Sequence, residues 1–369
     1  MRINRIELFH IKIPLNFMFK TSKTAIDHRE TIIIKITDEL QNKGYGEVVA
    51  FSEPSYTDET LIDSKYVLMY NYIRDIIHKD IKHPFDIHKW MKPFYPMALA
   101  ALENALVDLY AKREKQSIMD VVFSEETNDD IRAGIVLGDQ DVQTLIKQID
   151  YYQSEGYVRF KIKIKPEDGF SKLKVIREKY DNIQLLADAN KSYKFEQINE
   201  LKKLDELNLL CIEEPLDSVD FLEYQRLQKE LKTPICLDES IQTISDLKTA
   251  IELKAFKVLN IKVGRVGGLY YAKKMIELCR KSNIEYWVGS MVESGISKTL
   301  HVHLASLKDT YIPGDLSSSN RYFKRDIIKP EIIVKNGIIR VPKGYGLGVD
   351  VDEASLKNYT IDYKEMGGE

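Results

Sequence analysis

Charged residues recur at a fixed interval in the middle of the chain, and this interval constrains the fold more than any other feature. Lys163, Asp188, Glu213 and Asp238 are separated by 25 residues each, and Lys262 follows 24 residues later. Each lies at or near the end of a short apolar, β-branched run, and a helical stretch follows it. Such an interval fits one strand plus one helix, so the repeat predicts successive βα units of a parallel barrel.

Eight strand-like runs alternate with helical stretches from about residue 132 onward. These runs lie at residues 133–138, 158–164, 184–190, 210–215, 235–240, 258–264, 285–290 and 311–316. Strands that alternate with helices are typical of parallel sheets. The pattern predicts an α/β fold of the (β/α)₈ type, a modified TIM barrel, over residues 126–320.

The two ends of the chain depart from this alternation. Residues 1–125 contain strand-like runs (5–13 and 31–37) followed by helical ones (61–77 and 96–112), an order that indicates an α+β unit. Near the C-terminus, residues 331–342 predict a hairpin with an Asn-Gly turn. We expect the segment 321–369 to return to the N-terminal α+β domain.

Composition and charge exclude several classes of protein. The 54 basic and 57 acidic residues leave a net charge of −3, and no lysine/arginine block indicates binding to nucleic acid or to a membrane surface. The N-terminus lacks the apolar core of a signal peptide, and no apolar run approaches the roughly 18–20 residues of a membrane span. The three cysteines are odd in number and far apart, which argues against a disulfide framework. A reduced cytoplasmic protein with a small-molecule substrate is expected; a homo-oligomer is compatible with the sequence, which does not decide this point.

The three acidic residues of the repeat would converge at the carboxyl end of the barrel strands, where barrel enzymes build their active sites. Taken singly, Asp188, Glu213 or Asp238 could equally be a helix cap or a loop residue. Together and in register they would repel one another without a cation. Oxygen ligands of this number suit a hard ion, and we expect Mg²⁺, with Mn²⁺ as a possible substitute.

The lysines provide the reactive groups of this predicted site. Period-2 alternation in residues 160–165 places Lys161, Lys163 and Lys165 on one face, which in a barrel is the interior. Lys163 and Lys262 come from the second and sixth strands, so a substrate carboxylate between them would have an amine on each face of its α-carbon. A lysine base needs its pKa lowered from about 10.4, which partial burial, Lys161 and the metal would favour. The metal would stabilise the enediolate that proton removal creates.

Several motifs together resemble the enolase superfamily, muconate-lactonizing subgroup, and within it the o-succinylbenzoate synthase/N-acylamino acid racemase family. They include K-I-K at 161–163, D-A-N at 188–190, E-E-P at 213–215, D-E-S at 238–240, N-I-K-V-G-R-V-G-G at 260–268 and P-G-D-L at 313–316. The resemblance implies a capping domain, formed by the N-terminal region and the C-terminal tail, with lid loops near residues 17–24 and 48–55.

Residue by residue, the resemblance implies Lys163 as base and Lys262 as the opposing lysine, with Asp188, Glu213 and Asp238 as Mg²⁺ ligands. Supporting residues would be Lys161, Asn190 and Glu239. The expected substrate-binding residues are Phe19, Thr21, Ser290, Met291, Glu293 and Asp315.

The activity implied by the resemblance is that of a carbon–oxygen lyase. It is the dehydration of 2-succinyl-6-hydroxy-2,4-cyclohexadiene-1-carboxylate to 2-succinylbenzoate in menaquinone biosynthesis, through a Mg²⁺-stabilised enediolate. The alternative is an N-succinyl- or N-acylamino acid racemase, alone or as a second activity, in which both lysines transfer protons. Val136 favours the synthase, because we associate a serine at this position with relatives that racemise.

Other readings fit the sequence less well. A dipeptide epimerase would carry Asp-x-Asp at the eighth strand, where this chain has Gly314-Asp315-Leu316. Chemistry like that of mandelate racemase would need a histidine near Gly289–Ser290. From a different class, a catalytically silent barrel used for binding would have little reason to keep both lysines in register with the three carboxylates.

Overall fold

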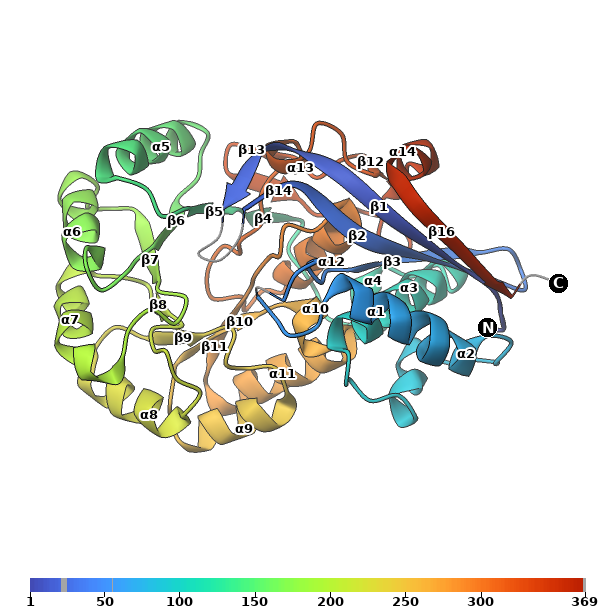
Figure 1. Ribbon diagram of the computed structural model, residues 1–369, viewed down its shortest axis with the longest axis horizontal. Coiled ribbons are helices and arrows are strands. Elements are labelled where there is room, and N and C mark those ends of the chain that lie inside the picture. Colours follow the sequence, from blue (N-terminus) through green and yellow to red (C-terminus); the bar gives the residue numbers. More distant parts are fainter. Residues whose placement is uncertain (21–24, 55, 368–369) are drawn as a thin grey trace.

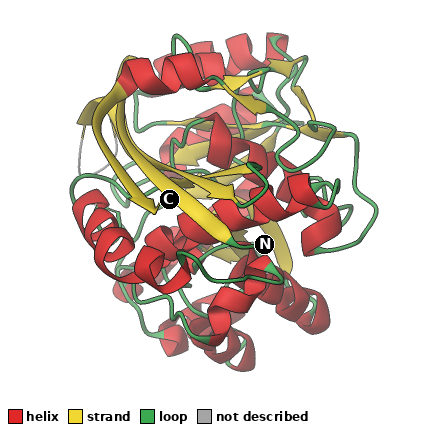
Figure 2. Cartoon of the chain, turned by 90° about the vertical axis from the view of Figure 1, so that its right-hand side faces the viewer, coloured by secondary structure: helices red, strands yellow, loops and turns green. Residues whose placement is uncertain are grey.

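The computed structural model describes residues 1–20, 25–54 and 56–367 (Figure 1). A barrel of parallel strands surrounded by helices lies beside a domain built on an antiparallel sheet. The N-terminus and the last described strand, residues 360–367, both lie at that second sheet (Figures 1 and 2). The α/β barrel with an additional α+β layer confirms the predicted fold class.

Among the described residues, seven parallel strands form the barrel sheet, in the order β5 to β11 with each strand paired to its sequence neighbour. The strands are β5 (Gly134–Leu137), β6 (Arg159–Lys163), β7 (Gln184–Asp188), β8 (Ile212–Glu213), β9 (Ile235–Leu237), β10 (Val258–Ile261) and β11 (Glu285–Val288). Each lies within one of the predicted runs. The structure ends each strand one to three residues before the end of the predicted run.

The eighth predicted strand, residues 311–316, is not a regular strand, yet it closes the barrel. On one side, Tyr311 N donates to Tyr286 O at 2.8 Å and Asp315 N donates to Val288 O at 3.1 Å. On the other side, Gly134 N donates to Gly314 O at 2.9 Å. Pro313 has no N–H to contribute to a ladder, which explains why the pairing is interrupted.

Helices surround the strands of the barrel (Figure 1). They are α5 (Val142–Ser154), α6 (Gly169–Lys179), α7 (Ile198–Lys203), α8 (Phe221–Glu230), α9 (Ile244–Glu252), α10 (Val263–Val266), α11 (Leu269–Ser282), α12 (Gly295–Ala305) and α13 (Ser319–Tyr322), with the 3₁₀ turns η3 (Phe195–Gln197) and η4 (Leu204–Leu207). Gly267 and Gly268 have φ values of 97° and 114° between α10 and α11. This conformation suits glycine and allows a tight turn shortly after Lys262.

The second sheet has the antiparallel order β16-β1-β2-β3. Its strands are β1 (Ile3–Lys20), β2 (Ala25–Asp38), β3 (Lys43–Val48) and β16 (Thr360–Gly367). The helices of this domain are α1 (Leu61–Val67), the π-helical turn η1 (Leu68–Tyr72), α2 (Ile73–Ile76), the 3₁₀ turn η2 (Pro84–Lys89), α3 (Pro96–Arg113) and α4 (Ile118–Val122). Helix α3 packs against β3 and is buried along most of its length, which explains its alanine-rich composition.

The C-terminal segment contacts both domains. The predicted hairpin is present as β13 (Val334–Lys335) and β14 (Ile338–Arg340), with Asn336 and Gly337 at positive φ in the turn. It pairs with β4 (Asp130–Arg132), just before the first barrel strand. The remaining elements are β12 (Ile328–Lys329), β15 (Asp350–Val351) and α14 (Glu353–Tyr359). Strand β16 then pairs with β1 in the other domain.

Alternation along β6 sorts its side chains as the sequence predicted, with one exception. Phe160 and Ile162 are buried in the apolar core, whereas Lys161 contacts acidic residues in the barrel interior. Lys165 was expected to point inward and this was wrong. It lies beyond the end of β6, is 53% exposed and pairs with Asp139 at 2.6 Å.

Within the described part of the chain, no helix is long and apolar enough to cross a membrane.

Candidate active site

The strand ends bring the five repeated residues to one mouth of the barrel. In the parallel ladder Lys163 pairs with Asp188, and Asp188 pairs with Glu213. Asp238 follows β9 directly, and Lys262 follows β10. The three carboxylates are almost completely buried. Register therefore explains why Lys163, Asp188 and Glu213 lie side by side, whereas Asp238 lies two residues beyond Cys236, the partner of Glu213, and Lys262 follows the last residue of β10.

Lys163 has the more open of the two lysine environments. Its ammonium donates to Asp188 Oδ2 at 2.7 Å and to Asn190 Oδ1, and its side chain is 30% exposed. Asn190 in turn donates to Glu239 Oε1 at 3.2 Å. Burial and the neighbouring Asp238 raise the pKa of Glu239 to about 7. Asn190 and Glu239, both expected as supporting residues, thus form a polar chain that leads away from Lys163.

Lys262 is enclosed on several sides, and its side chain is 8% exposed. Its ammonium donates to Asp238 Oδ2 at 2.7 Å and to the hydroxyl of Tyr56, and it lies 4.5 Å from the centre of the Tyr56 ring. The Tyr56 hydroxyl also accepts from Arg265 at 2.8 Å and donates to Asp238 Oδ2 at 3.0 Å. Arg265 additionally donates to Asp238 Oδ1. A residue from outside the barrel therefore completes the surroundings of Lys262.

The loop that carries Tyr56 is fixed to the barrel by buried polar contacts. At the end of β3, Glu47 accepts hydrogen bonds from Ser294 N at 2.8 Å and from Ser297 N at 3.1 Å, at the start of α12. Arg29 donates to Val49 O at 2.5 Å and to Ala50 O at 3.0 Å. The contacts of Glu47 hold the end of β3 against the barrel, and those of Arg29, on β2, hold the beginning of the loop to its own sheet.

Lys161 lies deeper in the barrel and contacts several carboxylates. Its ammonium is 2.8 Å from both oxygens of Glu213, 2.9 Å from Asp315 Oδ2 and 3.2 Å from Asp188 Oδ2. Below it, the buried Arg159 donates to Asp315 Oδ1 at 2.7 Å and to Pro313 O at 2.7 Å. The interior beneath the mouth is therefore a layer of ion pairs.

The electrostatics of the carboxylates follow from burial and from these cations. Burial raises the pKa of Glu213 well above its usual range; Lys161 opposes this, while Asp188 and Asp238 add to it. Burial acts in the same direction on Asp188, but Lys161 and Lys163 outweigh it and lower the pKa. At Asp238, Arg265 and Lys262 likewise overcome burial and lower the pKa. The charge of each carboxylate thus affects the pKa of its neighbours at the mouth.

The donor set at the mouth suits a hard cation. Asp188, Glu213 and Asp238 offer carboxylate oxygens, which are the ligands that Mg²⁺ prefers. Ammonium and guanidinium groups contact these oxygens in the structure. Accordingly, the described residues contain no group of three or more His, Cys, Asp or Glu side chains already arranged around an ion. The three carboxylates therefore fit a hard cation by their chemistry and by their position at the mouth. Such a cation would have to share their oxygens with the lysines.

The expected substrate-binding residues differ in their surroundings. Ser290 donates to Glu293 Oε1 at 2.9 Å, and Met291 N donates to Glu293 Oε2 at 2.6 Å. Glu293 is completely buried and also contacts His301 Nδ1 at 3.1 Å, so its carboxylate faces protein groups. Thr21 and the side chain of Phe19 lie outside the described residues. A substrate-binding role for this set stays a prediction.

Sequence reasoning missed several polar residues of the site. Arg159 could have been found, because it precedes Lys161 by two positions and shares its face of β6. Arg265 lies one helical turn after Lys262, within the motif at 260–268 that carries part of the family resemblance. Tyr56 lies in a loop without periodicity, so no pattern in the sequence indicates where its ring goes.

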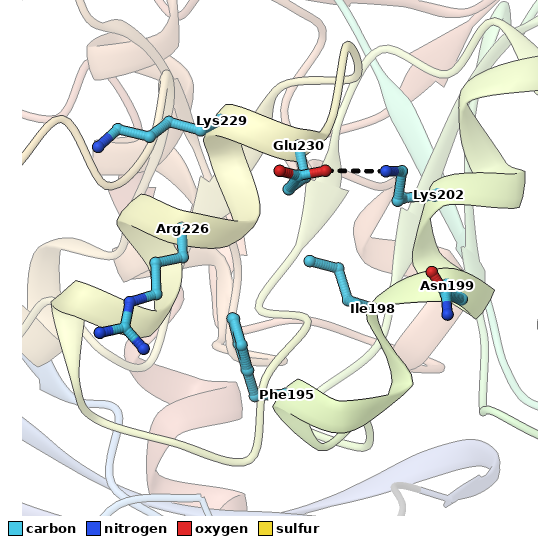
Figure 3. A pocket seen from close by; sticks show the side chains of 7 residues that line it. All are labelled: Phe195, Ile198, Asn199, Lys202, Arg226, Lys229 and Glu230. Carbon is cyan, nitrogen blue, oxygen red and sulfur yellow. Dashed lines mark hydrogen bonds and ion pairs between the residues drawn. The ribbon is translucent and has the colours of Figure 1, made fainter.

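A surface hollow lies away from this constellation, on the outer helical layer (Figure 3). It has a volume of about 380 Å³ and is lined by Phe195, Ile198, Asn199, Lys202, Arg226, Lys229 and Glu230. Its Lys202 and Glu230 form an ion pair at 2.8 Å. None of the residues of the charged barrel mouth lines it, so the hollow is separate from the candidate active site.

Comparisons with known proteins match nearly the whole chain. Residues 144–355 match a family described as enolase C-terminal domain-like. An o-succinylbenzoate synthase of Bacillus subtilis (strain 168) is 41% identical, over 97% of this chain and 96% of that protein. An N-succinylamino acid racemase of Thermus thermophilus is 35% identical, over 99% of each chain. The crystal structure of an enolase-superfamily member from Listeria innocua Clip11262 superimposes with a TM-score of 0.95 at 34% identity, covering 100% of this chain and 99% of that one.

Proposed function

The chain belongs to the enolase superfamily, within it to the family of o-succinylbenzoate synthases and N-acylamino acid racemases, and we propose that it is an o-succinylbenzoate synthase. It would dehydrate 2-succinyl-6-hydroxy-2,4-cyclohexadiene-1-carboxylate to 2-succinylbenzoate in menaquinone biosynthesis. The observation that carries the proposal is the difference in exposure and contacts between the two lysines at the mouth. Lys163 is 30% exposed, whereas Lys262 is 8% exposed and held by Asp238 and Tyr56.

Dehydration requires one group that moves a proton and one that stabilises negative charge. In its neutral form, Lys163 would take the proton α to the substrate carboxylate, and as an ammonium it would return that proton to the departing hydroxyl group. The C–H bond and the C–O bond break, the ring gains a double bond and water leaves. The openness of Lys163 supports this role, because the base must reach the substrate.

Lys262 would act by its charge and position. Asp238, the Tyr56 hydroxyl and the face of the Tyr56 ring all favour a fixed ammonium at this point. Facing the substrate from the side opposite Lys163, this ammonium would stabilise the negative charge that develops on the carboxylate when the proton is removed.

We propose that Asp188, Glu213 and Asp238 hold Mg²⁺, with Mn²⁺ as a substitute. When bound, the cation would supply positive charge beside the substrate carboxylate and so make the α-proton easier to remove. Lys161, Asn190 and Glu239 would orient these ligands and Lys163 through the hydrogen bonds described above.

We further propose that residues 1–125 and 321–369 act together as a capping domain over the barrel catalytic domain, residues 126–320. The pairing of β16 with β1 supports the return of the tail to this domain. The hydrogen bonds of Tyr56 to Lys262 and Asp238 support a lid loop near residues 48–55. The other expected lid loop, near residues 17–24, includes residues 21–24, which lie outside the described part of the chain.

Racemisation of N-succinylamino acids is the second candidate, because the two lysines come from opposite sides of the barrel. In that reaction one lysine would remove the α-proton and the other would deliver a proton to the opposite face. The 35% identity to the Thermus thermophilus racemase supports this as an additional activity.

Steady-state turnover decides between these activities. We expect rapid turnover of the synthase substrate and slower turnover of a panel of N-succinylamino acids, with both abolished by EDTA. Turnover of the amino acid derivatives alone would replace the proposed function with the second candidate. Activity of either kind that resists EDTA would contradict the proposed metal site.

A further inference from the structure

Asp315 has contacts that do not suit a substrate-binding residue. Its side chain is 7% exposed, and both oxygens are occupied: Oδ1 by Arg159 at 2.7 Å and Oδ2 by Lys161 at 2.9 Å. Its backbone N–H donates to Val288 O, which fixes it in the closing segment of the barrel. Asp315 therefore faces the ion-pair layer below the mouth.

Lys161 is the group through which Asp315 reaches the candidate metal site. Its ammonium contacts Glu213 and Asp188 on one side and Asp315 on the other. A divalent cation at Asp188 and Glu213 would compete with this ammonium for the same oxygens. An ammonium that already has a carboxylate partner on the far side gives up these oxygens at lower cost.

We infer that Asp315 is a positioning residue that holds the Lys161 ammonium on the eighth-strand side of the barrel, so that Asp188 and Glu213 stay available to a divalent cation. The inference rests on the proposed Mg²⁺ site. It replaces the substrate contact that the sequence suggested for Asp315. Without this carboxylate, the Lys161 ammonium would depend on Asp188 and Glu213 alone and would compete with the cation.

Removal of Arg159 should affect Mg²⁺ affinity differently from removal of Asp315. It shares Asp315 with Lys161 and lies 5.2 Å from the centre of the Trp287 ring, while the Lys161 ammonium lies 5.1 Å from it. Removal of Arg159 would leave the Asp315 carboxylate entirely to Lys161. Mg²⁺ binding should then be unchanged or tighter, whereas loss of Asp315 should weaken it.

Calorimetric titration of the metal-free protein with Mg²⁺ alone tests the inference. We expect Asp315→Asn to bind Mg²⁺ about ten-fold more weakly than the wild type, the change typical of a lost charged partner. Asp309→Asn is the matched control. It breaks an equally close pair with Arg280, at 2.8 and 2.9 Å, just before the same segment but on the exposed outer side. Its affinity for Mg²⁺ should equal that of the wild type.

A double-mutant cycle separates the proposed path from simple loss of a nearby negative charge. If Asp315 acts through Lys161, then Asp315→Asn should change Mg²⁺ affinity less than about two-fold in the Lys161→Met background. An equal loss in both backgrounds would overturn the inference, as would unchanged affinity in Asp315→Asn itself. If the single variant does not fold, the charge-balanced Arg159→Met/Asp315→Asn protein takes its place with the same expectation.

The wild-type titration separates this inference from the proposed function. A wild type that binds no Mg²⁺ would contradict the metal site and, with it, the role of Asp315. A wild type that binds Mg²⁺ while Asp315→Asn binds equally well would contradict only the role of Asp315.

Discussion

Replacement of Lys163 by alanine tests the proposed base, and its consequences can be worked out from the contacts of the side chain. The ammonium contacts Asp188 at 2.7 Å and Asn190, and Asp188 keeps Lys161 at 3.2 Å as a second cationic partner. A partly exposed ion pair contributes roughly 0–1 kcal/mol to stability, so Lys163→Ala should fold normally. A positioned general base contributes about 10²–10⁴-fold to rate, so kcat for dehydration should fall by about 10³-fold.

The assay combines steady-state dehydration with exchange of the α-proton in D₂O, followed by proton NMR. Lys165→Ala is the matched control, since Lys165 is a lysine two residues farther along the chain, lies outside the mouth, is exposed and pairs with a single aspartate at 2.6 Å. This control should keep wild-type turnover. If Lys163→Ala retained more than about a tenth of the wild-type rate with Mg²⁺ binding intact, the reasoning that gives Lys163 the base role would be refuted.

Further predictions follow from Tyr56, from Glu293 and from the metal. Tyr56→Phe keeps the ring but removes the hydroxyl contacts to Lys262 and Asp238. Exchange of the α-proton of an N-succinylamino acid should therefore slow for the enantiomer whose α-proton faces Lys262 and stay unchanged for the other enantiomer. Equal slowing of both enantiomers would contradict this prediction. His301 and the amide of Met291 overcome burial and lower the pKa of Glu293 to about 2, so this carboxylate stabilises the fold above its ordinary pKa and loses its effect as pH falls toward 2. The free energy of unfolding of Glu293→Gln, measured in urea, should therefore be about 3 kcal/mol lower than that of the wild type at pH 7, and this difference should narrow on acidification. A difference that is independent of pH would count against the prediction. EDTA should lower the melting temperature, and added Mg²⁺ should restore it. A melting temperature that changes with neither reagent would argue against a bound ion.

The barrel and the charged residues at its mouth could be predicted because both depend on regular repetition. One βα unit occupies a nearly constant length, so Lys163, Asp188 and Glu213 fall at equivalent positions on neighbouring strands. Alternation within β6 likewise predicts which side chains enter the barrel. Its failure at Lys165 has a simple reason. The strand ends at Lys163, and period-2 geometry does not continue past its last residue.

The parts of the site that could not be predicted come from segments without a period. Tyr56 is 206 residues from Lys262 in sequence, and only the packing of a loop against the barrel brings its hydroxyl to the ammonium. Asp315 was singled out, but its contacts were not foreseen. The segment around it lacks regular strand pairing, so alternation could not indicate that the carboxylate faces Lys161 and Arg159.

The charges gathered at and below the mouth bear on what can bind there. The cationic side chains are Arg159, Lys161, Lys163, Lys262 and Arg265. The carboxylates that contact them are Asp188, Glu213, Asp238 and Asp315. Glu239, whose pKa is raised to about 7, adds a carboxyl that is only partly ionised at pH 7. A divalent cation would enlarge the excess of positive charge in a buried interior where unbalanced charge is costly. The excess is relieved when a substrate brings carboxylates of its own and when Lys163 works as a neutral amine. A substrate with two carboxylates, such as the one proposed here, would balance the site that the metal alone would leave too positive.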